Sequence, residues 1–244
     1  AGTNNVNGPL MLENTTSTYT HTTGISVINV AGDFNNNGVY TTGTGAATIN
    51  IAGNWYNNLT FTTSSTNTVT FNGTGSQTIS GSVSSKFNNL TINNNAGVNI
   101  SNDQTVNSTL TLTSGNLTIG SNNLILGSNA SAVAGGPFSA AKMIVADGSG
   151  EVRKNFTANG SYAFPIGDNT GTAEYSPITL NFTAGTYGAG AYTGVKVTNA
   201  KHPNNASTTD FLKRYWTVSN SGITSPSFNV TATYLPTDIN GTVG

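Results

Sequence analysis

Few residues in this chain of 244 could carry acid–base or nucleophilic chemistry. It has 9 Asp and Glu, 8 Lys and Arg, 2 His and no Cys, which excludes disulfides and thiolate metal sites. Charge clusters locally at Asp147, Glu151, Arg153 and Lys154. A lyase or glycosidase needs such groups to converge on one groove, whereas a solvated cap needs only local ion pairs. We expect the cap and assign no catalytic residue.

The other candidate groups are spread thinly. Asp33 and Asp103 differ in their offset from the neighbouring apolar segments, so we do not expect them to share a site. His21 and His202 stand alone in polar stretches, and neither belongs to a zinc signature or a nucleophile motif. Both histidines are expected on the surface, and these residues imply no cofactor.

The segment Asp33–Gly38 resembles the first half of a calcium-binding loop. Asp33, Asn35 and Asn37 occupy its first, third and fifth positions, and a glycine occupies the sixth. The twelfth position is Thr44, where such a loop has a bidentate Glu. The next repeat, Asn54–Asn58, has no acid at this point. We therefore expect a corner of the fold here and assign no metal ligand, while weak calcium binding stays open.

The elements that position these residues repeat along the chain. One apolar pattern starts every 20 or 21 residues, at Ile28–Gly32, Ile49–Gly53, Val69–Gly73, Leu90–Asn94 and Leu110–Thr113. A fixed period of this length indicates stacked coils of a solenoid. Three short strands fit in each coil, which predicts a three-sided parallel β-helix. Alternation predicts that the following residues fill its core: Leu90, Ile92, Val98, Ile100, Leu110, Leu112, Leu117, Ile119, Leu124 and Leu126.

Composition agrees with an all-β fold and excludes some partners. Asn and Thr make up roughly a third of the chain, far above ordinary usage, and they suit turns and exposed strand positions. Only 7% of residues are charged and the formal net charge is −1. No basic face is therefore expected for nucleic acid. No apolar run reaches about 18 residues, so no membrane insertion is expected.

The repeat pattern breaks after the fifth coil. Residues 127–157 read as an irregular loop around Gly135–Pro137 followed by a cap. Beyond residue 158 longer alternating segments begin, which predicts an antiparallel immunoglobulin-like sandwich. We therefore expect two domains, a parallel β-helix over 1–157 and a β-sandwich over 158–244. The expected sandwich strands are Tyr162–Phe164, Ile178–Phe182, Val195–Val197, Tyr215–Val218 and Phe228–Ala232.

Four segments occur in an order that resembles a family of surface proteins: Phe87–Asn94, Leu110–Gly115, Phe164–Asp168 and Arg214–Trp216. From about Gly24 onward the chain resembles the large repetitive cell-surface proteins of Bacteroidota exported by the type 9 secretion system. The resemblance implies an adhesin-like β-helix followed by a sandwich, located outside the cell on the bacterial surface. No sorting domain is visible, so we expect a piece of a longer parent protein.

These observations predict a non-enzymatic adhesin or structural stalk. Its rigid Thr/Asn-rich face would contact a glycan, a surface or another copy of the chain. The main alternative is a carbohydrate-active enzyme, a polysaccharide lyase or glycosidase built on a β-helix. A third is an ice-binding solenoid, because threonines occur in ranks at Thr60–Thr62, Thr68–Thr70 and Thr111–Thr113.

Aromatic residues offer one more surface that could bind sugars. Tyr40, Trp55, Tyr56 and Phe61 lie in adjacent coils and could stack on sugar rings. Trp55 corresponds to Phe34 in the repeat, so we expect it to pack under a corner. We expect Trp216 in the core of the sandwich.

Overall fold

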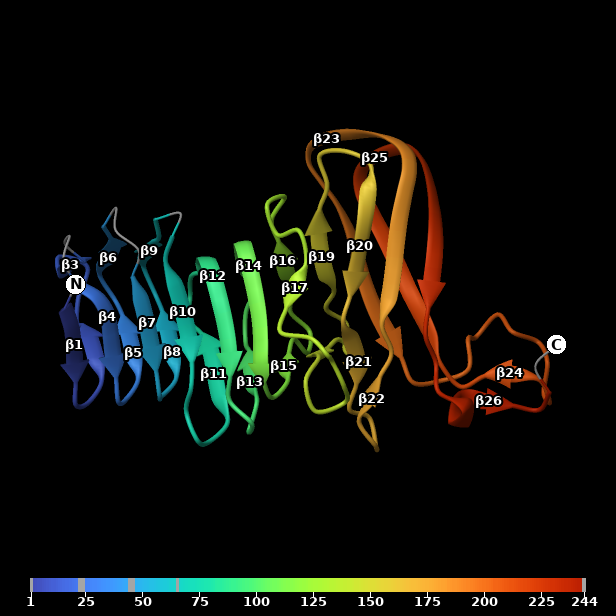
Figure 1. The fold of residues 1–244 in the computed structure, drawn as a ribbon, viewed down its shortest axis with the longest axis horizontal. Coiled ribbons are helices and arrows are strands. Elements are labelled where there is room, and N and C mark those ends of the chain that lie inside the picture. Colours follow the sequence, from blue (N-terminus) through green and yellow to red (C-terminus); the bar gives the residue numbers. More distant parts are fainter. Residues whose placement is uncertain (1, 22–24, 44–46, 65, 243–244) are drawn as a thin grey trace.

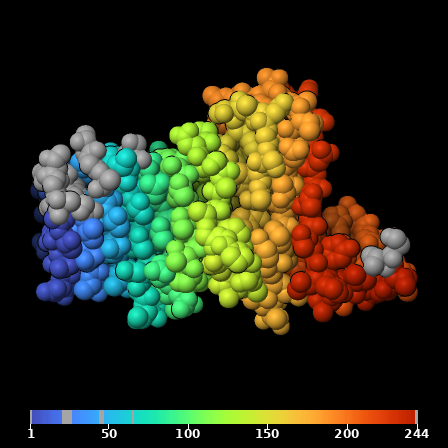
Figure 2. Space-filling view, in the orientation of Figure 1, coloured from blue at the N-terminus to red at the C-terminus, as the bar shows by residue number. Residues whose placement is uncertain are grey.

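The computed structural model describes residues 2–21, 25–43, 47–64 and 66–242. These residues form β-strands with almost no helix, and the predicted parallel β-solenoid is confirmed, with about seven turns. In Figure 1 the strands follow one another from the blue N-terminal end to the green turns around β14. Figure 2 shows these turns as a continuous wall, next to a taller antiparallel part.

Three parallel ladders of strands run along the solenoid. The first ladder joins β1 (Gly2–Val6), β4 (Ile25–Val30), β7 (Thr48–Ile51), β10 (Thr68–Phe71), β12 (Lys86–Asn93), β14 (Gln104–Ser114) and β17 (Val133–Ala134). The second joins β2 (Leu10–Leu12), β5 (Phe34–Asn36), β8 (Trp55–Asn57), β11 (Gln77–Ser80), β13 (Val98–Ile100), β15 (Leu117–Thr118), β18 (Ile144–Val145) and β21 (Ile166–Asp168).

The third ladder has two parts. A short sheet joins β3 (Thr18–His21), β6 (Val39–Thr42) and β9 (Thr60–Thr62). Farther along, the leading residues of β12 and β14 pair with each other, and the ladder continues through β16 (Leu124–Leu126) and β19 (Val152–Asn155). The strands β12 and β14 therefore turn a corner and contribute to two sides of the solenoid.

The core consists of apolar columns that cross the turns. In the first ladder Ile28 pairs with Ile49, Ile49 with Val69, and Val69 with Leu90, so like residues stack on like. All ten residues predicted for the core are at most 5% exposed, which confirms that prediction. Side chains alternate between the two faces of a strand, so the intervening Thr and Asn lie outside.

An aromatic cluster fills the first turns from inside. The rings of Phe34 and Trp55 stack with centroids 3.9 Å apart, and Phe61 meets Trp55 edge to face at 4.7 Å. Tyr40 is also buried, so the aromatic sugar-binding surface considered from the sequence does not form. Of its four members only Tyr56 faces outward, because it alternates with Trp55 along β8. Trp55 is fully buried and stacks on its repeat equivalent Phe34, so it is a packing residue as the repeat indicated.

The C-terminal part is an antiparallel sheet joined directly to the solenoid. Strand β23 (Ile178–Thr198) pairs antiparallel with β19, with β20 (Gly160–Phe164) and with β25 (Tyr215–Ala232). In Figure 1 these strands rise above the parallel turns. Strand β22 (Glu174–Tyr175) extends the second ladder. A small lobe holds β24 (Phe211–Leu212), β26 (Ile239–Asn240) and the 3-10 turn Pro236–Asp238.

This arrangement differs from the expected immunoglobulin-like sandwich, which the structure does not show. The physical reason is strand length: β23 spans 21 residues and β25 spans 18, so each continues through positions where the sequence suggested turns. Because β23 pairs with β19, it covers the open edge that the last parallel strand would present. The sheet thus crosses the expected boundary at residues 157 and 158. Trp216 is only partly buried, against the core.

Replacing the central aromatic side chain tests whether this packing stabilises the turns. We expect Trp55→Ala to lower the free energy of unfolding by about 3–5 kcal/mol, because it leaves a large cavity beneath Phe34 and Phe61. The matched control is Tyr56→Ala, whose effect should stay near 0.5 kcal/mol because Tyr56 faces outward. Urea titrations followed by far-UV circular dichroism measure both, and equal losses would contradict this account of the core.

Candidate functional site

The four clustered charges considered for catalysis do not meet in a groove. Glu151 and Arg153 form an ion pair at 3.0 Å, and the Arg153 guanidinium lies 4.8 Å from the centre of the Tyr192 ring. The carboxylate of Asp147 accepts hydrogen bonds from the backbone N–H of Asn169 and the hydroxyl of Thr170. These are local contacts between the last turn and the segment that follows it.

Lys154 points the opposite way from Arg153, because side chains alternate along β19. Its ammonium is buried and donates to the carbonyl oxygens of Gly127, Ser128 and Asn155 at 2.8, 3.1 and 2.7 Å. Burial lowers the pKa of Lys154 to about 8. All three ammonium protons are used in these bonds, so the lysine ties the loop at residues 127–128 to the last turn.

The acidic residues of the earlier turns brace corners. The Oδ1 atom of Asp33 accepts the backbone N–H of Asn54 at 2.7 Å, and Asp103 accepts that of Asn123 at the same distance. Asn54 repeats the contact one turn on, because its Oδ1 accepts the N–H of Thr78 at 2.9 Å. Each corner side chain therefore satisfies a backbone donor of the following turn, and an amide can replace the carboxylate.

The calcium-like segment does not converge on a point. Asn36 is buried inside the corner and donates to Oδ1 of Asn57 and to the carbonyl of Thr60, both at 2.8 Å. Asn37 accepts a hydrogen bond from the Asn58 side chain at 2.8 Å, and Asn35 alternates with the buried Phe34 and Asn36 along β5. Thr44 lies outside the described residues. Within the described part of the chain, no three His, Asp or Glu side chains are grouped to hold a metal ion.

The two histidines lie far apart in the fold. His21 is the last residue of β3. His202 lies in the loop before β24, where its ring is 4.8 Å from that of Tyr215 and its Nδ1 accepts the N–H of Asn204 at 3.2 Å. The His202 side chain thus contacts Tyr215 and Asn204 and not the charged cluster.

The structure contains a buried ionic cluster around Arg214 that the sequence did not predict. The guanidinium is fully buried and pairs with Asp168 at 2.5 Å, with Asp238 at 3.1 Å and with Glu174. It also donates to the hydroxyl of Ser176. This cluster joins the end of the second ladder to the small C-terminal lobe. Its partners lie 24 to 46 residues from Arg214, so no local spacing could predict it.

The most regular surface feature is the outer face of the first ladder. Its strands place two outward columns side by side, and we call these residues the Thr/Asn face. The first column contains Thr48, Thr68, Asn89 and Thr109, and the second contains Asn5, Asn29, Asn50, Thr70, Thr91 and Thr111. Neither column contains a charged residue, so these side chains offer hydroxyl, carboxamide and methyl groups to a partner. Val27, which pairs with Thr48, continues the first column with an apolar side chain.

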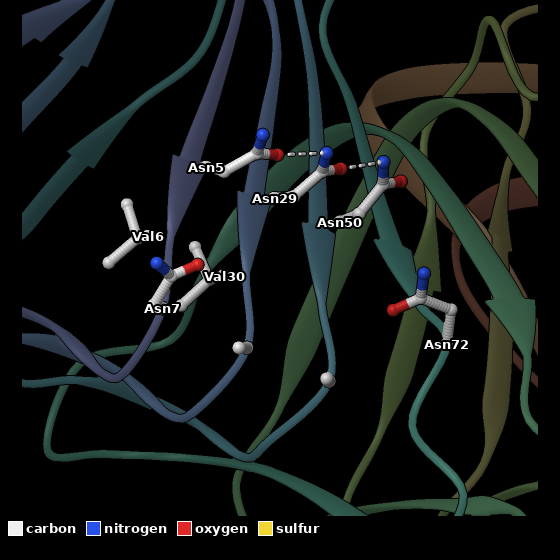
Figure 3. A pocket seen from close by; sticks show the side chains of 9 residues that line it. Asn5, Val6, Asn7, Asn29, Val30, Asn50 and Asn72 are labelled. Carbon is white, nitrogen blue, oxygen red and sulfur yellow. Dashed lines mark hydrogen bonds between the residues drawn. The ribbon is translucent and has the colours of Figure 1, made fainter.

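Hydrogen bonds between turns orient part of this face. The Asn29 side chain donates to Oδ1 of Asn5, and Asn50 donates to Oδ1 of Asn29, each at 2.8 Å (Figure 3). A carboxamide has two N–H donors and two acceptor lone pairs. Asn29 therefore keeps one donor and one acceptor site beyond the ladder. Beside these amides lies a hollow of about 280 Å³, bordered on its far side by Asn72 (Figure 3).

Removing the Arg214 cation tests whether the buried ionic cluster stabilises the attachment of the C-terminal lobe to the second ladder. We expect Arg214→Met to lower the free energy of unfolding by about 3–5 kcal/mol, because it leaves buried carboxylates without their cation. Arg153→Met is the matched control and should cost about 1 kcal/mol or less, since its ion pair is partly exposed. Urea titration of both variants measures the difference, and an unchanged midpoint for Arg214→Met would contradict a stabilising role.

Two further findings bear on the function. Within the described residues, no helix is long and apolar enough to cross a membrane. No protein-family model, curated protein or solved structure matches the chain.

Proposed function

We propose that this chain is a non-enzymatic adhesive or stalk-like module of an extracellular bacterial surface protein. The observation that supports the proposal is the alignment of uncharged Thr and Asn side chains in two columns across successive turns. Such a face makes many similar hydrogen bonds to a repetitive partner. A glycan, another surface or a second copy of the chain has this character.

Rigidity gives the face its binding advantage. Each turn is hydrogen-bonded to the next, so outward side chains repeat at about 4.8 Å. Because the surface is already ordered, the protein loses little conformational entropy when a partner binds. The columns contain no charge, so binding should depend little on ionic strength.

The resemblance to Bacteroidota surface proteins supports the rest of the assignment. It favours export to the cell surface and a place within a longer parent protein. The carbohydrate-active enzyme is less well supported, because Asp147, Glu151 and Lys154 point to different surroundings. We assign no catalytic, cofactor-binding or metal-binding residue, and neither nucleic acid nor a membrane interior as partner.

Incubation with a panel of polysaccharides tests this proposal. We expect the purified chain to be retained by at least one polymer without release of soluble sugar. The expected retention changes little between low and high salt, because hydrogen bonds rather than ion pairs hold the partner. Retention by gel-immobilised polymers and reducing-sugar release measure the two outcomes. Released sugar would overturn the non-enzymatic assignment.

Ice is a second candidate partner, favoured by the same register. Thr48, Thr68, Asn89 and Thr109 stand beside Asn50, Thr70, Thr91 and Thr111, which gives a flat array of hydroxyl and carboxamide groups with two regular spacings. The sequence suggested broken threonine ranks because Asn29 and Asn50 interrupt them. In the structure those asparagines stand in the same column as Thr70, so the threonine rank is interrupted there as the sequence indicated.

Ice growth in the presence of the chain distinguishes this candidate. If the face binds ice, crystals become faceted at micromolar protein, and Thr70→Lys restores round crystals by placing a charge in the middle of the array. Thr78→Lys is the control, because Thr78 is an outward residue of the second ladder. Crystal shape under a cooled-stage microscope is the readout. Round crystals with the unaltered chain would exclude ice as the partner.

A further inference from the structure

A third outward column beside the Thr/Asn face contains a gap. Asn7, Ala31, Ala52 and Asn72 follow one another in successive turns. The backbone N–H groups of Ala31, Ala52 and Asn72 donate to the carbonyls of Val6, Val30 and Ile51 at 2.9, 3.0 and 3.0 Å. Two exposed alanines therefore stand where the flanking turns carry asparagines.

The gap forms the hollow next to the oriented amides. Asn5, Asn29 and Asn50 form one wall, in the fixed orientation set by their hydrogen bonds (Figure 3). Asn7 and Asn72 lie at the two ends, and Ala31 and Ala52 lie between them with Val6 and Val30 nearby. The lining thus combines five carboxamides with the two alanine side chains, while Val30 is buried and Val6 packs against the core.

The chemistry of the lining restricts the ligand. No charged residue lines the hollow, so nothing there would neutralise a phosphate, a carboxylate or an ammonium group. Within the described part of the chain, the Asn7 and Asn72 side chains take part in no hydrogen bond of the protein, so their donors and acceptors are available. The apolar floor suits a C–H surface rather than a fully hydrated ion.

We propose that this hollow binds a neutral hexose unit of a polysaccharide. A pyranose ring has hydroxyl groups at its rim for the five carboxamides and a C–H face for the two exposed alanine side chains. A volume of about 280 Å³ lies at the small end of ligand pockets, which fits a single ring. The inference rests on the proposed function and names the ligand class and the site within it.

Binding at one such open site is expected to be weak. A dissociation constant on the order of 1 mM is typical when few groups are enclosed. Many copies of the chain on one surface would act together on a polymer and raise the apparent affinity without new contacts. A polymer carried on a gel is therefore a better probe than a free monosaccharide.

The test uses gel-immobilised dextran, mannan and galactan as neutral polymers, with polygalacturonate as the acidic contrast. We expect retention by at least one neutral polymer, little altered by salt. Ala52→Gln fills the hollow and should reduce that retention at least tenfold. Thr78→Gln is the matched control, because Thr78 is an outward residue of the second ladder and lies outside the Thr/Asn face, and it should behave as the unaltered chain does.

A second variant distinguishes loss of the binding site from a failure of the protein to fold. Asn72→Ala removes one carboxamide from the rim without filling the space or breaking a hydrogen bond of the fold, and should weaken retention severalfold. Far-UV circular dichroism confirms that each variant is folded. Loss of retention in both variants, with Thr78→Gln unaffected, supports the site.

Three results would overturn it in distinguishable ways. Equal retention of the unaltered chain, Ala52→Gln and Asn72→Ala would place glycan binding elsewhere and leave the proposed function standing. Retention only by polygalacturonate, lost in high salt, would exclude a neutral sugar as the ligand. No retention by any of the polymers would exclude the hollow as a glycan site and also remove the glycan from the proposed function.

Discussion

In-register parallel pairing between successive turns is the constraint on which the rest of the structure depends. Because Ile49 pairs with Ile28 and Val69 with Ile49, the strand residues of these turns lie beside their equivalents in the next turn. Apolar residues therefore form columns inside, and Thr and Asn form columns outside. The close stacking also limits the corners: Gly115 has φ of 75°, and a Cβ there would collide with the carbonyl of Asn94.

The same pairing explains why so many polar side chains are buried at the corners. A turn of the chain leaves backbone donors and acceptors that the ladders do not use, and burial without partners would be costly. Asn36 bonds to Asn57 one turn on, and Gln77 accepts hydrogen bonds from Gly73 and Asn94. Carboxamides suit this role because each one donates and accepts at once. The abundance of Asn in the chain is thus largely a property of the corners and outer columns.

The parts of the structure that the sequence predicts are those set by local pattern. The period and the alternation of Leu90, Ile92, Leu110 and Leu112 predict the first five turns and their core, because strand alternation depends only on neighbouring residues. The later turns, which continue to β21, were not predicted. The pairing of β19 with β23 and the Arg214 cluster join segments that are distant along the chain, and no spacing rule connects them. The Thr/Asn face could be predicted from the sequence only in part. Its residues were visible, but only the register shows that Asn29, Asn50 and Thr70 share one column.

The hollow beside that face shows how a binding site can arise in a repeat at small cost in stability. Its two alanines, Ala31 and Ala52, are exposed, and their backbone N–H groups keep the hydrogen bonds to the previous turn. The core columns beneath are complete, since Val30 and Ile51 remain buried. Only outward side chains are missing, and such side chains contribute little to folding. A solenoid can therefore change its outer columns turn by turn, because the interactions that hold the turns together lie in the backbone ladders and the core.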